Sequence, residues 1–353
     1  MENYAPFNQE DYLHSKDPKN QPEDQEQWNM NLENGILSAE QLEKLDVLDR
    51  PYLIEPWAKL GDLGFIFAAR GVGKTWLGIH LAHCLAANKD FGPWKVPTCE
   101  HRILYMDGEM SLADIKYRNH LLGAGSSKLF YLNHERLFEL TQAVLNLSYC
   151  ALQAAILTFC VTHQFGVLIL DNLSCLVSGV DENSAIEWEK ILPWLLQLRR
   201  NKITVIFIHH AGREGLYLRG HSKREDPAAW IMQLKLPKND PDHEIEGACF
   251  ISSFAKYRNA PQRPNDIMWN FHPLDNAKEI IVSHERCDLY DIFLELVAHG
   301  NHQCKIIADE MVISQVNVSR LAQKAAQNGD IEIKDRKYYI KSSGTKGYMP
   351  YKD

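Results

Sequence analysis

Short apolar runs alternate with stretches of helical spacing between residues 63 and about 285 of this 353-residue chain. The runs are LGFIFAA, ILYMD, VLILD and ITVIFIHH, and the segments around them predict helices from 74 and near 112–122, 150–163 and 184–199. We expect Pro193 to kink or interrupt the last of these helices. Buried apolar strands separated by helices are typical of a mostly parallel sheet covered on both faces. The pattern therefore predicts an α/β fold.

The pattern changes twice in the second half of the chain. After residue 228, the runs WIMQLKL, GACFISSFA, IMWNF and EIIV are separated by turn residues, and they predict a hairpin-rich extension of the same sheet. From about residue 286, DLYDIFLELVAHG places its apolar residues at helical spacing, which indicates that a small helical unit begins there.

The first 35 residues differ from the rest in charge. They carry eight acidic residues, two lysines and few large apolar residues, so we expect this segment to be flexible. The following SAEQLEKLD predicts a short helix with Ser38 as its N-cap. We therefore divide the chain into a flexible segment 1–35, an α/β domain 36–285, a helical domain 286–342 and a tail 343–353.

Composition limits the class of protein. With 45% hydrophobic and 24% charged residues, the chain is typical of globular proteins. It has no apolar run near the roughly 20 residues of a membrane span and no secretory signal, so we expect a cytoplasmic protein without a membrane partner. The eight cysteines form no CxxC pair and indicate neither disulfides nor zinc. Most of the net charge of −8 lies in the N-terminal segment, so it does not exclude a nucleic-acid partner.

The segment FIFAARGVGKTWLGIHLA has the arrangement of a phosphate-binding P-loop, with an apolar strand, a glycine-containing turn and a helix. In such a loop backbone N–H groups bind the β-phosphate, Lys74 neutralises β- and γ-phosphate oxygens, and the Thr75 hydroxyl ligates Mg²⁺. Ala68 replaces the first glycine of the strict pattern, at a position that needs a small residue more than a positive φ. We predict an ATP and Mg²⁺ site formed by Ala69, Arg70, Gly71, Val72, Gly73, Lys74, Thr75 and Trp76.

Acidic residues at two strand ends complete this prediction. Asp171 ends the run VLILD, where it can hold the water shell of Mg²⁺ in the Walker B role. Glu109 follows the run ILYMD and reaches further than Asp107, so we expect Glu109 to orient and deprotonate the attacking water. The alternative is that these acids are turn or helix-cap residues.

Two further pairs of polar residues follow later strands. His209 and His210 end ITVIFIHH, and we expect His210 in particular to hydrogen-bond the γ-phosphate and to sense its loss. Lys256 and Arg258 follow the run FISSFA two residues apart, so an extended backbone can direct both cations to one site. The alternatives are a structural histidine pair and a solvated basic strand end.

Together, PYLIEPWAKLGDLGFIFAARGVGKT, LYMDGEM, IHHAGREGLYLRGHSKRE and AKYRNAP resemble the RecA-like ATPases of the DnaB and KaiC branch. The resemblance covers about residues 40 to 285 and is closest to RepA-type replicative helicases of plasmids and their AAA-type relatives from mobile elements. It implies a RecA-like fold and a homo-oligomeric ring, which we expect to be a hexamer. It also implies that Lys256 and Arg258 reach the γ-phosphate of the neighbouring subunit's ATP. Arg258 would be the arginine finger, which can raise the rate about 10³-fold or more.

The loop GREGLYLRGHSKRED, residues 212–226, corresponds to a region that faces the central channel of the ring in this family. Its cations can bind the phosphates of single-stranded DNA, and its glycines permit close approach. The alternative is an ordinary surface loop. The cations are Arg213, Arg219, Lys223 and Arg224.

The segment CKIIADEMVISQVNVSRLAQKAAQNGDIEIKDRKYYIK resembles a winged helix-turn-helix, whose second helix ends at Gly329 and whose wing turns at Asp335-Arg336. Polar residues of that helix can read base edges in a major groove, and cations of helix and wing can bind phosphates of duplex DNA. The mild basicity of the segment leaves protein docking as the alternative. The candidates are Gln315, Asn317, Ser319, Arg320, Gln323, Lys324, Arg336 and Lys337.

The leading hypothesis is a ring-forming DNA motor that uses Mg²⁺ and ATP, a replicative-type helicase of a plasmid, phage or other mobile element that works with replication proteins. The first alternative is an ATP-switched DNA-binding protein, regulatory or defensive, that does not translocate. The second is a subunit of a larger complex, in which the winged helix and the acidic segment dock other proteins. All three share the nucleotide site and differ in their response to DNA.

Overall fold

The computed structural model of the chain describes residues 25–97, 100–123, 126–177, 185–211, 225–237, 247–274, 279–287, 289–311 and 313–341. The chain forms two compact units, Met1–Asp49 and Arg50–Asp353. None of the described helices combines the length and the apolar character that crossing a bilayer requires.

The described part of the first unit consists of two short helices, α2 (Gln25–Gly35) and α3 (Ala39–Lys44). Ser38 is the N-cap of α3, as predicted: its hydroxyl accepts a hydrogen bond from the Gln41 N–H, and the Gln41 side chain accepts one from the Ser38 N–H. We expected flexibility up to residue 35, but the last 11 residues of that segment form helix α2. Good helix formers (Gln, Glu, Met and Leu) occupy six of these 11 positions, which favours the helix. Neither helix contains a buried residue.

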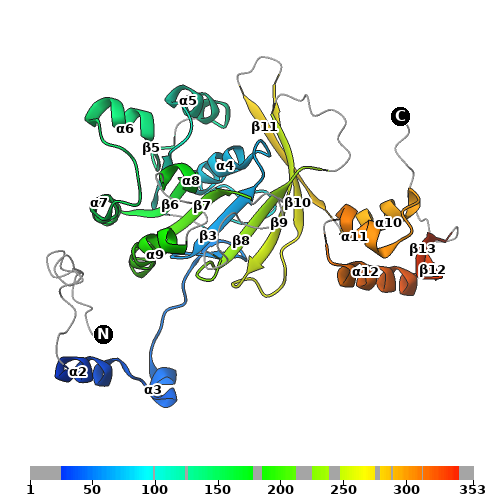
Figure 1. The fold of residues 1–353 in the computed structure, drawn as a ribbon, viewed down its shortest axis with the longest axis horizontal. Coiled ribbons are helices and arrows are strands. Elements are labelled where there is room, and N and C mark those ends of the chain that lie inside the picture. The colour runs from blue at the N-terminus through cyan, green and yellow to red at the C-terminus, as the bar shows by residue number, and fades with distance from the viewer. Residues whose placement is uncertain are drawn as a thin grey trace. The chain divides into compact units, whose positions relative to one another are not determined.

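Within the described ranges of the second unit, nine strands form one sheet in the order β11–β10–β9–β8–β3–β7–β6–β4–β5 (Figure 1). The pairings from β8 to β5 are parallel, and the pairings from β8 to β11 are antiparallel. The predicted α/β fold with a mostly parallel sheet and a hairpin-rich extension is therefore confirmed. The strands are β3 (Leu63–Ala68), β4 (Arg102–Asp107), β5 (Leu129–Asn133), β6 (Phe165–Asp171), β7 (Thr204–His210), β8 (Trp230–Lys235), β9 (Ala248–Tyr257), β10 (Asp266–Pro273) and β11 (Ile280–Cys287), and β1 (Tyr52–Ile54) pairs separately with β2 (Ala58–Lys59).

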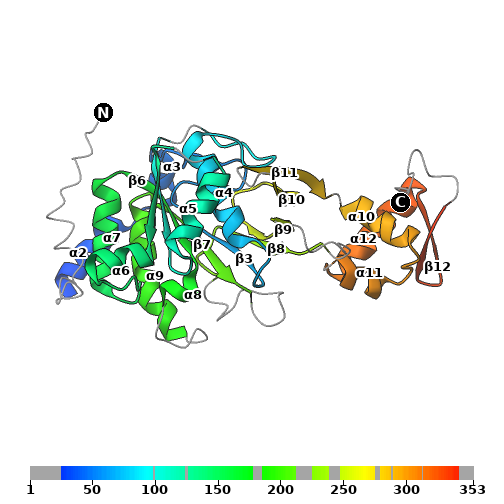
Figure 2. The ribbon, with the colours of Figure 1, turned by 90° about the horizontal axis from the view of Figure 1, so that it is seen from above.

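Helices cover both faces of this sheet (Figures 1 and 2). The four predicted helices are present as α4, α5, α7 and α9, and α9 runs through Pro193 without ending there. Strand β5 and helices α6 and α8 are absent from the sequence-based prediction, because segments of four to eight residues are too short to show a clear period. The helices are α4 (Lys74–Ala87), α5 (Leu112–Leu121), α6 (His134–Thr141), α7 (Cys150–Thr162), α8 (Leu173–Leu176) and α9 (Ala185–Arg200).

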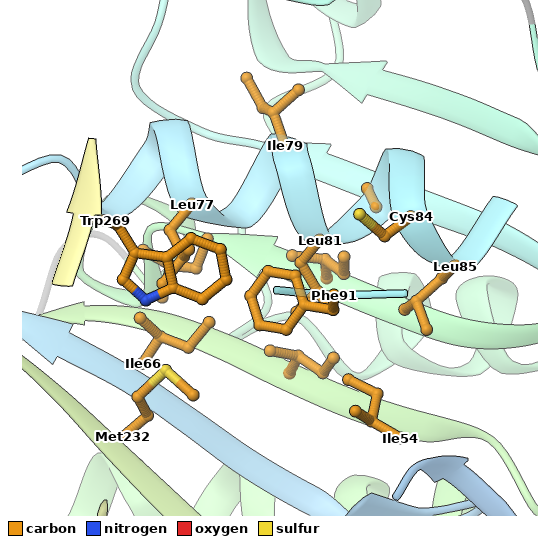
Figure 3. Packing of buried hydrophobic residues seen from close by; sticks show 14 of the residues in the cluster. Ile54, Ile66, Leu77, Ile79, Leu81, Cys84, Leu85, Phe91, Met232 and Trp269 are labelled. Atoms are coloured by element: carbon orange, nitrogen blue, oxygen red, sulfur yellow. The ribbon is translucent and has the colours of Figure 1, made fainter. Parts of the chain in front are cut away.

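Successive residues of the central strand β3 pack against opposite helical layers. Ile66 lies in the same buried cluster as Leu77 of α4 (Figure 3). On the other face, the ring of Phe65 lies 6.1 Å from that of Trp188 on α9 and stacks on Phe207 of β7 at 5.0 Å. Because neighbouring side chains of a strand point to opposite faces, a strand covered on both sides must be apolar throughout. This packing holds the carboxyl end of β3 in place, where the P-loop begins.

Aromatic rings join α4 to the antiparallel strands. Phe91 follows α4 in the chain, and its ring lies 4.9 Å from that of Trp269 on β10. His80 on α4 contacts the rings of Phe91, Trp269 and Phe271 at centroid distances of 5.7, 6.0 and 5.7 Å. Burial, with smaller effects from two nearby histidines, lowers the pKa of His80 to about 4.

This histidine predicts a pH dependence of stability. Because the folded-state pKa of His80 lies below its ordinary value of 6.5, the unfolded chain binds more protons between about pH 4 and 6.5, and stability falls as the pH drops through this range. When the pH drops from 6.5 to 4, the free energy of unfolding of His80→Gln is expected to fall by about 2 kcal/mol less than that of wild type. Urea unfolding at several pH values measures it, with the exposed His120→Gln as the control. Equal pH profiles for His80→Gln and wild type would contradict the prediction.

The C-terminal elements have a hydrophobic core of their own, in which Phe293 and Ile331 are fully buried. Gly329 ends α12 in the left-handed conformation, with φ 83°, as predicted. Asp335 and Arg336 both have positive φ and form the predicted hairpin turn. The elements are α10 (Leu289–Ala298), α11 (Cys304–Met311), α12 (Gln315–Asn328), β12 (Ile331–Lys334) and β13 (Lys337–Ile340).

Candidate active site

The P-loop connects β3 to α4 at the carboxyl edge of the sheet. Gly71 and Gly73 have φ of 80° and 115°, in the left-handed region, and Gly73 is the N-cap of α4. A Cβ at Gly73 would also lie 2.6 Å from the ring of Phe250 on β9, so two independent reasons exclude a side chain there. Ala68 is not among the described residues with positive φ, which explains why alanine can replace the first glycine.

The predicted loop residues differ in exposure. Ala69, Arg70 and Gly71 are exposed, whereas Val72 is buried against the core. The Trp76 ring lies 4.8 Å from the guanidinium carbon of Arg118 on α5 and 6.2 Å from the ring of Phe271 on β10. Since this side chain packs within the domain, a contact of Trp76 with phosphate would come from its backbone N–H.

Lys74, the first residue of α4, is buried and folds back over the loop. Its ammonium group donates hydrogen bonds to the carbonyl oxygens of Ala68, at 3.1 Å, and Ala69, at 2.7 Å. Burial lowers the pKa of Lys74 to about 8, and the charges of Asp171 and Glu109 oppose this shift. A cation beside free N–H groups at a helix N-terminus is suited to binding phosphate.

Asp171 ends β6 and is buried. Its Oδ2 accepts a hydrogen bond of 2.6 Å from the Tyr105 hydroxyl, and the Thr75 side chain also hydrogen-bonds the carboxylate. Burial raises the pKa of Asp171, and these two hydrogen bonds oppose the shift. The structure therefore brings together Asp171 and Thr75, the two residues predicted to hold Mg²⁺.

Asp107 is a second buried carboxylate at this site. In the sequence it was considered only as a shorter alternative to Glu109 for the general base. It ends β4 and pairs in register with Asp171 on β6. Its Oδ1 accepts hydrogen bonds from the Met110 N–H, at 2.8 Å, and the Asn133 amide, at 3.3 Å, whereas no described residue donates a hydrogen bond to its buried Oδ2. Burial, and then the charge of Asp171, raises the pKa of Asp107 to about 7.

These oxygens fit a magnesium ion. Mg²⁺ prefers oxygen ligands, and at nucleotide sites it keeps several waters and binds one or two carboxylates together with phosphate. Asp171, the Thr75 hydroxyl and Oδ2 of Asp107 supply such oxygens, and a divalent cation would favour the charged form of both carboxylates. Among the described residues there is no cluster of three or more His, Cys, Asp or Glu side chains arranged to enclose a metal.

Glu109 and His210 meet across the end of β6. The Glu109 carboxylate Oε2 lies 4.0 Å from His210 Nε2. His210 is level with Ala68 of the P-loop strand, and the next N–H along the chain donates to the Ala68 carbonyl oxygen at 2.8 Å. The Glu109 side chain is 53% exposed, whereas the His210 side chain is only 13% exposed. The structure thus brings the predicted base and the predicted sensor together.

Asn172 lies between these two residues, and the sequence analysis missed it. Its side-chain amide donates a hydrogen bond to Glu109 Oε2, and its Nδ2 lies 3.2 Å from His210 Nε2. The only sequence signal for Asn172 was its position directly after Asp171.

Lys256 and Arg258 do not lie at this site. Strand β9 is antiparallel to β8, and Lys256 pairs with Ile231 near the amino end of β8. The Arg258 N–H donates to the Ala229 carbonyl oxygen, and the Ala229 N–H to the Leu63 carbonyl oxygen at the start of β3. Arg258 is therefore about 16 Å along the strand from the P-loop end of β3. The two cations lie at the edge of the sheet opposite the P-loop.

The two cations differ in their surroundings. The Lys256 ammonium group donates hydrogen bonds to the backbone carbonyl oxygens of Glu225 and Asp226. Burial, and then the charge of Arg258, lowers the pKa of Lys256. Arg258 itself is exposed. Lys256 is thus held by its own backbone, whereas Arg258 is accessible to a second molecule.

The predicted DNA-binding residues fall into two groups. Arg213, Arg219, Lys223 and Arg224 lie outside the described residues. The C-terminal candidates on α12 are exposed except for Ser319, which is half-buried, and the Lys324 ammonium group lies 4.8 Å from the centre of the Tyr290 ring. The exposed candidates are Gln315, Asn317, Arg320, Gln323, Lys324, Arg336 and Lys337. DNA contact by these residues stays a prediction.

The sequence profile of the AAA domain family matches residues 37–215, slightly more than half of the chain. The chain belongs to the AAA domain family. The matched AAA domain contains the P-loop, Glu109, Asp171 and His210, whereas Lys256 and Arg258 lie beyond it. Comparison with curated protein sequences gives no match.

The solved structures that are similar to the AAA domain protein include a KaiC-like protein and a flagellar accessory protein. The KaiC-like protein PH0186 from Pyrococcus horikoshii OT3 is 14% identical, with a TM-score of 0.47, and the alignment covers 67% of this chain and 99% of that chain. The flagellar accessory protein FlaH from Methanocaldococcus jannaschii is 16% identical, with a TM-score of 0.44, and the alignment covers 70% of this chain and 97% of that chain.

Proposed function

We propose that this AAA domain protein is a Mg²⁺-dependent, RecA-like ATPase that completes its active site between neighbouring subunits of a ring and acts on DNA. One observation carries the proposal: the P-loop, Asp171, Glu109 and His210 converge at one edge of the sheet, whereas Arg258 lies at the opposite edge. An arginine finger at that edge cannot serve the P-loop of its own chain. It can serve the P-loop of a neighbour.

The residues of the P-loop edge bind the substrate in this proposal. The loop N–H groups and the Lys74 ammonium group bind the β- and γ-phosphates of ATP. Asp171, Thr75 and Asp107 would hold Mg²⁺, which when bound neutralises charge on the phosphate oxygens. Since Lys74 donates to two loop carbonyl oxygens in the structure, it exchanges these partners for phosphate oxygens when ATP binds.

The hydrolytic step uses Glu109 as the general base. A water oxygen forms a bond to the γ-phosphorus, Glu109 accepts the proton of this water, and the bond from the γ-phosphorus to the bridging oxygen breaks, which releases ADP and inorganic phosphate. His210 hydrogen-bonds the γ-phosphate and loses this contact on phosphate release. Arg258 of the adjacent subunit neutralises the charge that develops on the γ-phosphate oxygens.

The most specific form of the proposal is a hexameric, replicative-type DNA helicase of a plasmid, phage or other mobile element that works with replication proteins. Its support is the sequence resemblance stated above. The C-terminal order of three helices and a hairpin, with an exposed polar face on α12, supports the winged helix-turn-helix interpretation and binding of duplex DNA.

Hydrolysis rates with and without DNA test the DNA part of the proposal. Single-stranded DNA is expected to raise ATP hydrolysis, and the double replacement Arg219→Ala/Arg224→Ala to abolish this stimulation while leaving the basal rate unchanged, because the loop binds DNA phosphates. The double replacement Lys116→Ala/Arg286→Ala removes two exposed cations elsewhere and is the matched control.

The outcomes separate the candidate functions. An unchanged DNA response in the loop variant would discard the DNA-binding loop. Unwinding of a forked duplex that is lost in Lys74→Ala supports the helicase. Nucleotide-dependent binding of duplex DNA without unwinding would favour the ATP-switched regulator instead.

A further inference from the structure

The Asn172 side chain is held from three sides at the end of β6. Asn172 is 1% exposed. Its Oδ1 accepts a hydrogen bond of 3.0 Å from the Cys175 N–H, which makes it the N-cap of α8. Its Nδ2 donates to Glu109 Oε2 and lies 3.2 Å from His210 Nε2. Since an amide nitrogen carries two hydrogens, these two contacts use both of them.

These contacts permit one orientation of the amide. Exchange of its oxygen and nitrogen would place Oδ1 against the Glu109 carboxylate and the NH₂ group against the Cys175 N–H, and both contacts would become repulsive. His210 Nε2 accepts the second amide hydrogen in the tautomer that carries the proton on Nδ1, whereas donation to a γ-phosphate requires the tautomer that carries it on Nε2. Asn172 therefore provides a rigid, buried donor that faces two site residues.

Glu109 needs such a donor more than the other residues of the site do. Its side chain is 53% exposed, whereas Asp107 and Asp171 are buried and held by other hydrogen bonds. A long exposed carboxylate samples several rotamers, and a base acts only within hydrogen-bond reach of the proton that it removes. The amide occupies Oε2 and leaves Oε1 available to the attacking water.

We propose that Asn172 is the positioning residue of the hydrolytic base: its amide holds the Glu109 carboxylate at the γ-phosphate and so raises the rate of hydrolysis without binding ATP itself. This inference rests on the proposed role of Glu109. Displacement of a catalytic group by about 1 Å can lower a rate about 100-fold, so the expected effect is on kcat.

The replacement Asn172→Asp separates positioning from helix capping. Aspartate caps helices as well as asparagine does, so Oδ1 can still accept from the Cys175 N–H, but both amide donors are lost. The kcat for ATP at saturating Mg²⁺ is expected to fall about 10- to 100-fold in Asn172→Asp and in Asn172→Ala, while the KM for ATP stays within about twofold. Because the new carboxylate is buried against Glu109, the melting temperature of Asn172→Asp should fall, and its circular dichroism spectrum at the assay temperature shows that it is still folded. Asn201→Asp, the same exchange at the end of α9, should keep the wild-type kcat.

Combination with Glu109→Gln completes the test. If Asn172 acts through Glu109, Asn172→Ala lowers kcat no further in the Glu109→Gln background. The positioning role is overturned if both Asn172 variants keep the wild-type kcat, or if Asn172→Ala lowers kcat in the Glu109→Gln background as much as it does in wild type. In either case, a strongly reduced kcat of Glu109→Gln leaves the proposed function intact. A fully active Glu109→Gln instead refutes Glu109 as the base and, with it, the inference.

Discussion

Lys74→Ala is expected to lower ATP hydrolysis by about 100-fold or more. In the structure Lys74 is the buried cation at the N-terminus of α4, with its ammonium group against the carbonyl oxygens of Ala68 and Ala69. Its charge acts where negative charge accumulates on the γ-phosphate, in surroundings that screen it poorly. Phosphate release measured at saturating Mg²⁺ gives the rate, and Lys89→Ala, which removes an exposed cation just beyond α4, should hydrolyse ATP like wild type.

Loss of activity in this variant should not come from loss of stability. Since the folded-state pKa of Lys74 is lowered to about 8, the unfolded chain binds more protons between about pH 8 and 10.5. The charged side chain therefore destabilises the fold below pH 8, by up to about 3 kcal/mol. Lys74→Ala should accordingly be at least as stable as wild type at pH 7. A variant that unfolds more easily, or that hydrolyses ATP at the wild-type rate, would contradict the assignment.

The second large effect is expected for Arg258→Ala, which should lower the rate of ATP hydrolysis by about 10³-fold. This effect is expected although Arg258 lies about 16 Å along the sheet from the P-loop of its own chain. The reason is that the transferring γ-phosphate group spreads negative charge over its oxygens, which the guanidinium group of the neighbouring subunit neutralises in the proposed shared site. The Kd for ATP should change far less than kcat, because the finger acts on the transition state. Arg286→Ala, an exposed arginine of β11, is the matched control.

Mixing of two inactive variants tests whether the site is shared. Some interfaces between Arg258→Ala and Lys74→Ala subunits combine an intact P-loop with an intact finger, so the mixture should recover part of the wild-type rate. A mixture that remains inactive, although native mass spectrometry shows mixed rings, would contradict a shared site. So would Arg258→Ala hydrolysing ATP at full rate as a monomer.

Much of the fold could be predicted because its strands are buried on both faces. The runs that became β3, β4, β6 and β7 are almost entirely apolar between their polar ends, and short runs of this kind bounded by turn residues favour central strands. The residues at their carboxyl ends could be placed together for the same reason, since parallel strands end at one edge. Strand β5 and helix α6 were missed because both lie at the margin of the domain, where burial is partial and the period is weak.

Within the site, the sequence indicated residues whose chemistry follows from their type and spacing, and it missed those whose role depends on contacts. Asn172 acquires its three partners only when β4, β6 and β7 lie side by side. Asp107 acquires a raised pKa only through burial and its register with Asp171.

By itself, the sequence determined the P-loop, the order of the apolar strands and the acids and histidines at their ends, because these depend on local residue patterns. The tertiary structure alone decided that Arg258 lies at the edge opposite the P-loop, because that position follows from the antiparallel register of β9 with β8. It also decided that Lys256 is held by backbone carbonyl oxygens while Arg258 is exposed. Local patterns record which residues a chain carries, whereas the pairing of distant strands sets which of them can reach a common substrate.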